Sequence, residues 1–264
     1  MDTDIITFVL LLITFWNWRF MANLRFYTHS PLALNTTLQL SESAAAHATR
    51  ALRLKAGDNI ILFNGDGIDY DCTLTTVKKN EVTATVIGAR PLTNESPLNI
   101  TLLQAISSGD RMDFTIQKAV ELGVKKIQPI NSQRSVVKLT YDRAAKRVEH
   151  WQNVAISACE QSGRAVVPEV LVPLTLEAWL AQNPHNSSTR ILLNPVGAKR
   201  LTDIPKPSAS IELLIGAEGG LSKDEIDLAT SQQFQSIILG PRILRTETAA
   251  LTAISVMQAQ WGDF

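Results

Sequence analysis

The sequence GAEGGLS (216–222) is the first segment whose residue types suggest a ligand site. It follows an apolar run and precedes a helix-capping box formed by Ser222 and Glu225. Glycines in such a turn let backbone amides approach a ligand closely. The segment is neither a phosphate-binding GxxxxGK loop nor a GxGxxG fingerprint, so we do not expect a polyphosphate or a dinucleotide. Taken alone, it is better interpreted as an ordinary strand-to-helix turn.

The segment LGPRILRTETA (239–249) strengthens the case for a site. It places Arg242, Arg245 and Glu247 directly after another apolar run, with Thr246 available to cap the next helix. Charged residues so close to the end of a buried strand are costly unless they have a function. The two segments together therefore predict a ligand site where strands end.

A basic stripe follows a different part of the chain. Between residues 134 and 147, five positive charges minus the one negative charge of Asp142 leave a local charge of +4. The positive residues are Arg134, Lys138, Arg143, Lys146 and Arg147. Such a stripe can bind phosphates, and a solvated helix face explains it equally well. A second, weaker basic candidate comprises Arg50, Arg53 and Lys55.

The overall composition limits the partners of the chain. The 264 residues carry 25 Lys plus Arg and 25 Asp plus Glu, so the formal charge is zero and any RNA site must be a local patch. Cys72 and Cys159 lie far apart without CxxC spacing, and the four histidines are scattered. We therefore expect no metal and no disulfide framework, and reduced thiols in a cytoplasmic protein.

The first twenty residues form a separate extension. The apolar run 5–16 is shorter than the roughly 20 residues that a membrane-spanning helix needs, so a membrane is not an expected partner. No basic region or small-residue cleavage site marks a secretory signal. Residues 1–20 are interpreted either as preceding a translation start at Met21 or as a weak anchor or greasy tail.

The remaining chain divides into two parts with different periodicity. Short alternating runs between residues 24 and 88 predict a small antiparallel β-barrel, with one helix near residues 43–52, in a domain of residues 21–92. The proline-containing segment 91–97 is the expected linker. Residues 95–264 then alternate strands and helices, which predicts an α/β domain with a mostly parallel sheet. The expected strands are 99–106, 124–130, 190–195, 211–216 and 234–240, and the expected helices are 112–122, 141–160, 174–182, one beginning at the capping box, and 246–260.

Six collinear motifs carry a family resemblance. LLIGAEGGLS, LGPRILRTETA, SSGDRMDFTIQKAVELGV, QRSVVKL, HWQNVAISACEQSGR and RFYTHSPL together resemble the 16S rRNA uracil-N3 methyltransferases of the SPOUT superfamily, from Leu24 to Phe264. The resemblance implies a PUA-like RNA-binding barrel followed by a trefoil-knotted, S-adenosylmethionine-dependent methyltransferase domain. It also implies a homodimer that acts on 16S rRNA, preferably in the assembled small ribosomal subunit.

The same resemblance implies the position of the cofactor. The residues expected around S-adenosylmethionine are Leu193, Gly216, Glu218, Gly220, Leu239, Gly240, Ile243 and Leu244. Three positions depart from the family pattern: Ala217 replaces proline, Ser108 replaces arginine, and Gln133 replaces glutamate. None of the three is a residue that we expect to be essential.

Methylation of uracil N3 requires loss of an imide proton while negative charge develops on the carbonyl oxygens. Arginine cannot act as the base but can stabilise that charge, and we assign this role to Arg245, with Arg111 positioning the base or a phosphate. Glu218 and Glu247 are the expected proton acceptors. For Glu247, a simple interaction with the helix dipole is equally good as an explanation.

Two alternative functions stay open at this point. One is a knotted methyltransferase that acts on another RNA, for example at a ribose 2′-hydroxyl. The other is a non-catalytic ribosome-binding module with the same fold. Both glycine-rich turns and the RTET sequence argue against the second alternative, and the full-length resemblance argues against the first.

Overall fold

The computed structural model describes residues 24–78, 81–137, 141–185, 187–196 and 199–264. The extension 1–20 and Lys138 lie outside these residues. The chain separates into two compact units, the first comprising the residues up to Thr93 together with Gly163–Val166, and the second comprising Asn94–Ser162 and Val167–Phe264. In the described part of the chain, no helix is both long and apolar enough to cross a membrane.

The first unit is built on a five-stranded sheet with the order β1-β3-β4-β5-β2. Its strands are β1 (Arg25–Tyr27), β2 (Thr37–Gln39), β3 (Asn59–Phe63), β4 (Ile68–Lys78) and β5 (Glu81–Pro91). Alternate side chains of β4 and β5 are buried, as the period-two pattern predicts. The expectation of a purely antiparallel sheet is wrong for one pair, because β1 pairs with β3 in parallel. The segment between them contains β2 and a helix, which is long enough for the crossover that a parallel pair needs.

The helix of this unit is shorter and less regular than expected. Helix α2 (Glu42–Ala46) begins after Ser41, whose hydroxyl accepts a hydrogen bond from the Ala44 amide at 3.2 Å. It continues as a π-helical turn, η1 (His47–Ala51). The buried Arg25 guanidinium pairs with the Asp69 carboxylate and donates to the Arg164 carbonyl oxygen at 3.0 Å, which holds residues 163–166 within this unit.

The second unit contains a seven-stranded sheet with the order β10-β12-β9-β11-β6-β7-β8. Its strands are β6 (Ile100–Ala105), β7 (Lys126–Ile130), β8 (Glu169–Val170), β9 (Thr189–Leu193), β10 (Lys199–Arg200), β11 (Ile211–Ile215) and β12 (Gln235–Ile238). All its strand pairs are parallel, so the predicted parallel sheet is confirmed. The two-residue strands β8 and β10 were not predicted, because two residues are too few to show a period.

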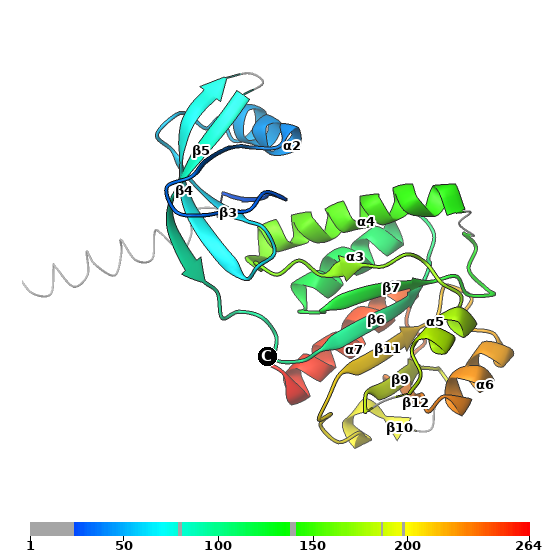
Figure 1. Ribbon diagram of the computed structural model, residues 1–264. Coiled ribbons are helices and arrows are strands. Elements are labelled where there is room, and N and C mark those ends of the chain that lie inside the picture. The colour runs from blue at the N-terminus through cyan, green and yellow to red at the C-terminus, as the bar shows by residue number, and fades with distance from the viewer. Residues whose placement is uncertain (1–23, 79–80, 138–140, 186, 197–198) are drawn as a thin grey trace, which may run out of the picture. The chain divides into compact units, whose positions relative to one another are not determined.

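Helices cover both faces of this sheet (Figure 1). Helices α3 (Asp110–Glu121) and α7 (Thr246–Trp261) pack together on one face, with α4 (Tyr141–Ser162) against α3. Helices α5 (Leu176–Gln182) and α6 (Lys223–Ser231) cover the other face and share an apolar cluster with the sheet. The predicted glycine end of α3 is confirmed by the positive φ of 87° at Gly123, and the predicted Ser222–Glu225 capping box is present.

The strand order determines where a site can form. At this side of the sheet β9 lies between β12 and β11, although neither neighbour is next to it in the sequence. Because they are parallel, their carboxyl ends lie along one edge, and the loops that follow them are also neighbours. The loop after β9, the turn at 216–222 and the loop at 239–245 therefore lie side by side.

Candidate active site

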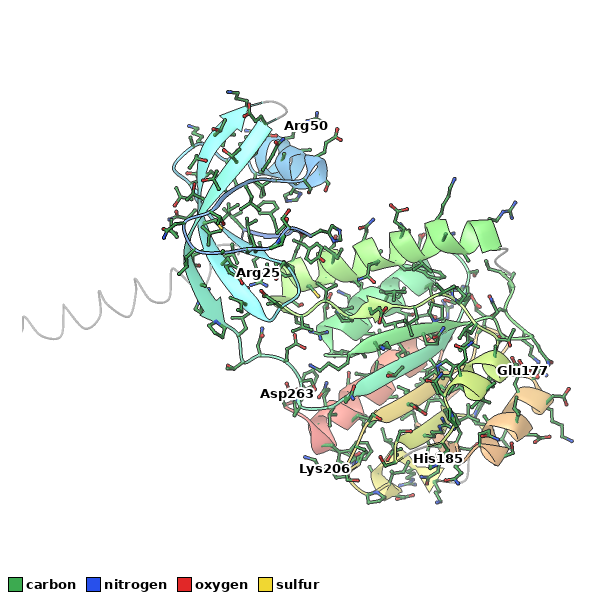
Figure 2. The ribbon with its side chains drawn as sticks, in the orientation of Figure 1. Arg25, Arg50, Glu177, His185, Lys206 and Asp263 are labelled. Carbon is green, nitrogen blue, oxygen red and sulfur yellow. The ribbon has the colours of Figure 1, made fainter. Side chains whose placement is uncertain are left out.

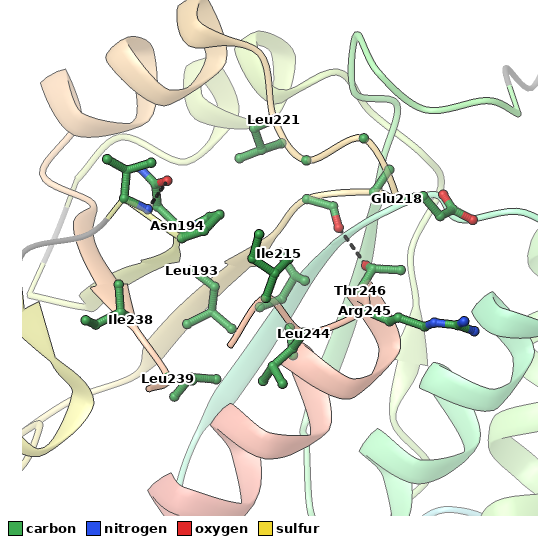
Figure 3. A pocket seen from close by; sticks show the side chains of 18 of the residues that line it. Leu193, Asn194, Ile215, Glu218, Leu221, Ile238, Leu239, Leu244, Arg245 and Thr246 are labelled. Carbon is green, nitrogen blue, oxygen red and sulfur yellow. Dashed lines mark hydrogen bonds between the residues drawn. The ribbon is translucent and has the colours of Figure 1, made fainter. Parts of the chain in front are cut away.

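A cavity of about 710 Å³ lies at the carboxyl ends of β9, β11 and β12 (Figure 3). Its wall contains all eight residues that we expected around the cofactor: Leu193, Gly216, Glu218, Gly220, Leu239, Gly240, Ile243 and Leu244. Arg111, Arg134, Arg245 and Glu247 also line it. The structure thus brings the expected cofactor residues and all four expected catalytic residues into one place.

The turn after β11 is folded tightly on itself. A Cβ atom on Gly216 would lie 2.8 Å from the carbonyl carbon of Gly220, so only glycine fits at position 216. Gly220 has a φ of +68°, and its amide donates to the Ala217 carbonyl oxygen at 2.9 Å. This turn therefore presents backbone to the cavity in a shape fixed by its own contacts.

Helix α7 is joined to the same turn by a buried hydroxyl. The Thr246 Oγ1 donates to the Gly216 carbonyl oxygen at 2.6 Å (Figure 3), and Gln104 Nε2 donates to Thr246 Oγ1 at 2.9 Å. The expectation that Thr246 is the helix N-cap is wrong: Arg245 is the N-cap residue, and Thr246 lies in the first turn, where its side chain reaches across to β11. Gln104 was not among the predicted site residues, although a glutamine in an otherwise apolar strand indicates a buried polar contact.

Glu218 is surrounded by hydrogen-bond donors. One carboxylate oxygen, Oε1, accepts from the Ser108 amide at 2.9 Å, from the Ser108 hydroxyl at 2.8 Å and from Arg111 Nη1 at 2.9 Å. Burial raises the pKa of Glu218, but the hydrogen bonds from Ser108 and Arg111 outweigh it and lower the pKa to about 2. Such a carboxylate is a weak proton acceptor, so this environment suits an anchor for Arg111 better than a base.

Arg245 and Glu247, unlike Glu218, have no side-chain hydrogen-bond partners among the described residues. Arg245 is exposed, and its side chain extends toward the side where Glu218 lies, away from Leu193 and Leu239 (Figure 3). Within the described part of the chain, the Arg245 guanidinium has no hydrogen-bond or ion-pair partner. The Glu247 Oε2 atom is buried and also lacks a hydrogen-bond partner among the described residues. The Arg245 guanidinium is therefore open to a substrate, and Glu247 lines the same cavity with one carboxylate oxygen buried.

The basic stripe is divided between two places. Arg134 lies at the cavity, where its Nη1 donates to the Gly219 carbonyl oxygen at 3.1 Å. Arg143, Lys146 and Arg147 are exposed on α4. In the first unit, Arg50 is exposed on the helical segment (Figure 2), and Arg53 is exposed shortly after it. The structure brings only Arg134 of these residues to the main cavity.

Two family models match the chain. A model of the RNA methyltransferase domain matches residues 94–258, and a model of the RNA methyltransferase PUA domain matches residues 40–87.

Curated relatives align with this chain over most of their own length. Ribosomal RNA small subunit methyltransferase E of Buchnera aphidicola (from Acyrthosiphon pisum) is 33% identical over 240 residues, which cover 91% of this chain and 94% of the relative. The protein of that name from Bacillus subtilis is 33% identical, covering 85% of this chain and 90% of its own.

Solved structures are similar along nearly the whole chain. Ribosomal RNA small subunit methyltransferase E from Neisseria gonorrhoeae, bound to S-adenosyl methionine, is 45% identical with a TM-score of 0.85, over 91% of this chain and 98% of that one. A putative methyltransferase from Legionella pneumophila, in complex with the same cofactor, is 39% identical with a TM-score of 0.87, over 92% and 99% of the two chains.

Proposed function

The chain belongs to the ribosomal RNA small subunit methyltransferase E family, and we propose that it transfers a methyl group from S-adenosylmethionine to N3 of a uridine in 16S rRNA. The observation that carries this proposal is the cavity at the ends of β9, β11 and β12. Cofactor-binding turns, a free arginine and a free carboxylate line the same wall there. A non-catalytic module would have no need of this combination.

The residues present fit S-adenosylmethionine. Apolar side chains of Leu193, Leu239 and Leu244 offer a surface for a flat base, and the turn 216–220 offers backbone groups at close range. The tight packing of Gly216 on Gly220 keeps side chains out of that part of the cavity. When bound, S-adenosylmethionine supplies a methyl group on a positively charged sulfur.

The residues of this chain would then handle the charge and the proton of uracil. Arg245 stabilises the negative charge that develops on the carbonyl oxygens. Arg111, held by Glu218, positions the base or an adjacent phosphate. Glu247 receives the N3 proton, because its carboxylate lines the cavity and has no hydrogen-bond partner among the described residues, whereas the three hydrogen bonds to Glu218 stabilise its ionised form.

We further propose that the second unit contains the trefoil knot of this family. The strand order supports the proposal: β12 lies between β9 and β10, although β9 and β10 are joined by residues 194–198 alone. A chain that inserts a later strand between two closely connected earlier ones has the type of threading that a knot requires.

A homodimer is the proposed assembly. Val196 and Ile243 border the cofactor cavity and are 87% and 86% exposed, which is unusual for apolar side chains beside a deep cavity. A second copy of the chain would cover them. Light scattering should then give about twice 29 kDa. A fully active monomer would remove this part of the proposal.

The first unit is the proposed RNA-binding domain, with residues 21–92 as its main part and 95–264 as the methyltransferase domain. Arg50 and Arg53 are exposed there and are free to meet phosphates. The assembled small ribosomal subunit is the proposed substrate in preference to naked RNA.

Nucleoside mass spectrometry of ribosomal RNA tests the proposed function directly. Cells that lack the protein should lack 3-methyluridine in 16S rRNA, and restoring the gene should return it. Loss of another methylated nucleoside, such as a 2′-O-methylated one, would point to the alternative RNA methyltransferase. An unchanged set of nucleosides would favour a non-catalytic role.

A further inference from the structure

A second cavity, of about 10 Å³, lies beside the loop that holds Glu218. It is lined by the loop before α3, by the first turn of α3, by Val137 ahead of α4 and by one face of α4: Ile106, Ser107, Gly109, Met112, Val137, Arg147 and Trp151. Its volume is that of about one water molecule or one oxygen atom. The next residue in the loop, Ser108, donates twice to Glu218, so this small cavity and the methyl-transfer site share a loop.

Two buried polar groups at this cavity have no partner. Ser107 is 3% exposed and Trp151 is 2% exposed. The Ser107 Oγ and the Trp151 Nε1 are both buried without a hydrogen-bond partner among the described residues. Buried polar groups in folded proteins are normally hydrogen-bonded, so these two indicate a missing oxygen or nitrogen atom.

The surroundings add further donors. Helix α3 begins after Gly109, which has a φ of 56° and gives no side-chain cap, so the first amides of this twelve-residue helix are open. Arg147 is exposed, and within the described residues its guanidinium has no partner. Of the carboxylates in the first turn, Asp113 lies 2.6 Å from His150 Nε2, and Asp110 is exposed to solvent.

The polar side chains that line the cavity, Ser107, Arg147 and Trp151, can all donate hydrogen bonds, and the rest of the lining is apolar side chains and Gly109. The indole nitrogen, the guanidinium and the helix amides can only donate, and the Ser107 hydroxyl can donate as well. A water molecule requires acceptors for its own two hydrogens, and this lining offers few. An anionic oxygen requires donors alone, and a helix amino terminus beside an arginine favours negative charge.

We infer that this cavity receives one non-bridging oxygen of an RNA phosphate, whose charge Arg147 neutralises. The inference rests on the proposed RNA substrate and adds a defined anchoring point to it. Since Ser108 and Arg111 of the same loop and helix contact Glu218, the bound phosphate belongs to a nucleotide close to the methylated one. The site fixes the RNA backbone while the base enters the main cavity.

The test uses the full chain and 16S rRNA transcribed in vitro and reconstituted into small ribosomal subunits, the proposed substrate. Arg147→Ala, Ser107→Ala and Trp151→Phe should each weaken RNA binding, with Arg147→Ala giving about a ten-fold loss. For Arg147→Ala, the slope of log K against log salt should fall by about 0.7, the value for one phosphate on single-stranded RNA. Calorimetry should show unchanged S-adenosylmethionine affinity in all three variants, which verifies that they are folded.

Lys206→Ala is the matched control. Lys206 is an exposed cation that precedes β11, so it lies at the amino-end edge of the sheet, away from both cavities (Figure 2). Lys206→Ala removes one positive charge, as Arg147→Ala does, but outside the proposed site. Its slope of log K against log salt should therefore equal that of the unmodified chain.

Phosphate ethylation interference locates the contact on the RNA. The unmodified chain should show interference at a phosphate that disappears in both Arg147→Ala and Ser107→Ala. If the unmodified chain methylates the RNA but Arg147→Ala keeps its salt slope and its interference pattern, the phosphate site is wrong and the proposed function stands. If the unmodified chain neither binds nor methylates the RNA, the proposed function itself fails and this inference fails with it.

Discussion

Two loops that line the same cavity differ in how they are held. The turn 216–221 is fixed by its own backbone packing, by Thr246 and Arg134, and by the three hydrogen bonds to Glu218. The loop 239–245 has exposed residues from Gly240 to Ile243, and among the described residues its side chains make no hydrogen bond to another segment. One wall of the site is therefore preorganised, whereas the other is left open for the ligand, the substrate or a second copy of the chain to complete.

The largest effect is expected at the end of the open loop. Arg245→Ala should lower kcat by about 10² to 10³, because loss of one donor to a developing oxyanion typically costs that much. Its S-adenosylmethionine affinity should change little, and lysine should restore only part of the rate, since it lacks the planar fork. Single-turnover methylation and calorimetry separate the two quantities.

Arg242→Ala is the matched control for Arg245, because it removes an exposed arginine from the same loop. We expect a much smaller loss of kcat from it. Should Arg245→Ala abolish cofactor binding while the rate at saturation is unchanged, Arg245 belongs to the cofactor wall instead.

The fixed turn should be sensitive to a single methyl group. Gly216→Ala places a Cβ atom 2.8 Å from the backbone of Gly220, so the turn has to shift. We expect S-adenosylmethionine binding to weaken on the order of 100-fold, or roughly 3 kcal/mol, by calorimetry. A Cβ atom on Gly240 in the open loop would have no atom within 4 Å. Gly240→Ala therefore costs only the backbone strain of a positive φ, about 1–2 kcal/mol. Equal losses of S-adenosylmethionine affinity in the two variants would contradict the contrast between the loops.

Glu218→Gln tests how the fixed turn is anchored. The pKa of Glu218 in the folded protein is lowered from 4.5 to about 2, so its ionised form stabilises the fold above pH 4.5. That contribution is lost as the pH falls from about 4.5 to about 2. The difference in Tm between the unmodified chain and Glu218→Gln should therefore be full at pH 6 and shrink toward pH 2, as measured by scanning calorimetry.

Two further variants complete this test. Glu121→Gln breaks a surface pair with Lys118 and should give a smaller Tm difference at pH 6. Glu247→Gln should lower kcat more than Glu218→Gln does, since it removes the proposed proton acceptor. The reverse order in kcat would return the role of base to Glu218.

The smallest effect is expected from a change toward the family pattern. Ala217→Pro restricts the unfolded chain at a position where the pattern has proline, and should raise the free energy of unfolding by no more than about 1 kcal/mol. Cofactor affinity should stay the same, because the turn is already in its final shape. A large gain in affinity would show that the turn is less preorganised than its contacts indicate.

The sequence predicted the parallel sheet and a ligand site at the two glycine-containing turns, because strand periodicity and glycine position are local signals. The individual residues of the cavity wall came only from the family resemblance. It could not show that Ser108 and Arg111 meet Glu218, since the contacts join residues more than a hundred positions apart. For the same reason it suggested Glu218 as a base. The parallel pairing of β1 with β3 was also missed, because alternation in a strand does not reveal the direction of its neighbour.

The position of residues 163–166 has a practical consequence for dissecting the molecule. These four residues pack with the first unit, although the segments before and after them belong to the second. The chain thus passes from one unit to the other three times, and cutting it once near Thr93 does not separate two self-sufficient pieces. A chimaera that transfers only residues 24–93 of this chain into a relative would place Arg25 against a foreign segment in place of the Arg164 carbonyl. Exchange of the two segments together is the smallest swap that keeps this buried arginine satisfied.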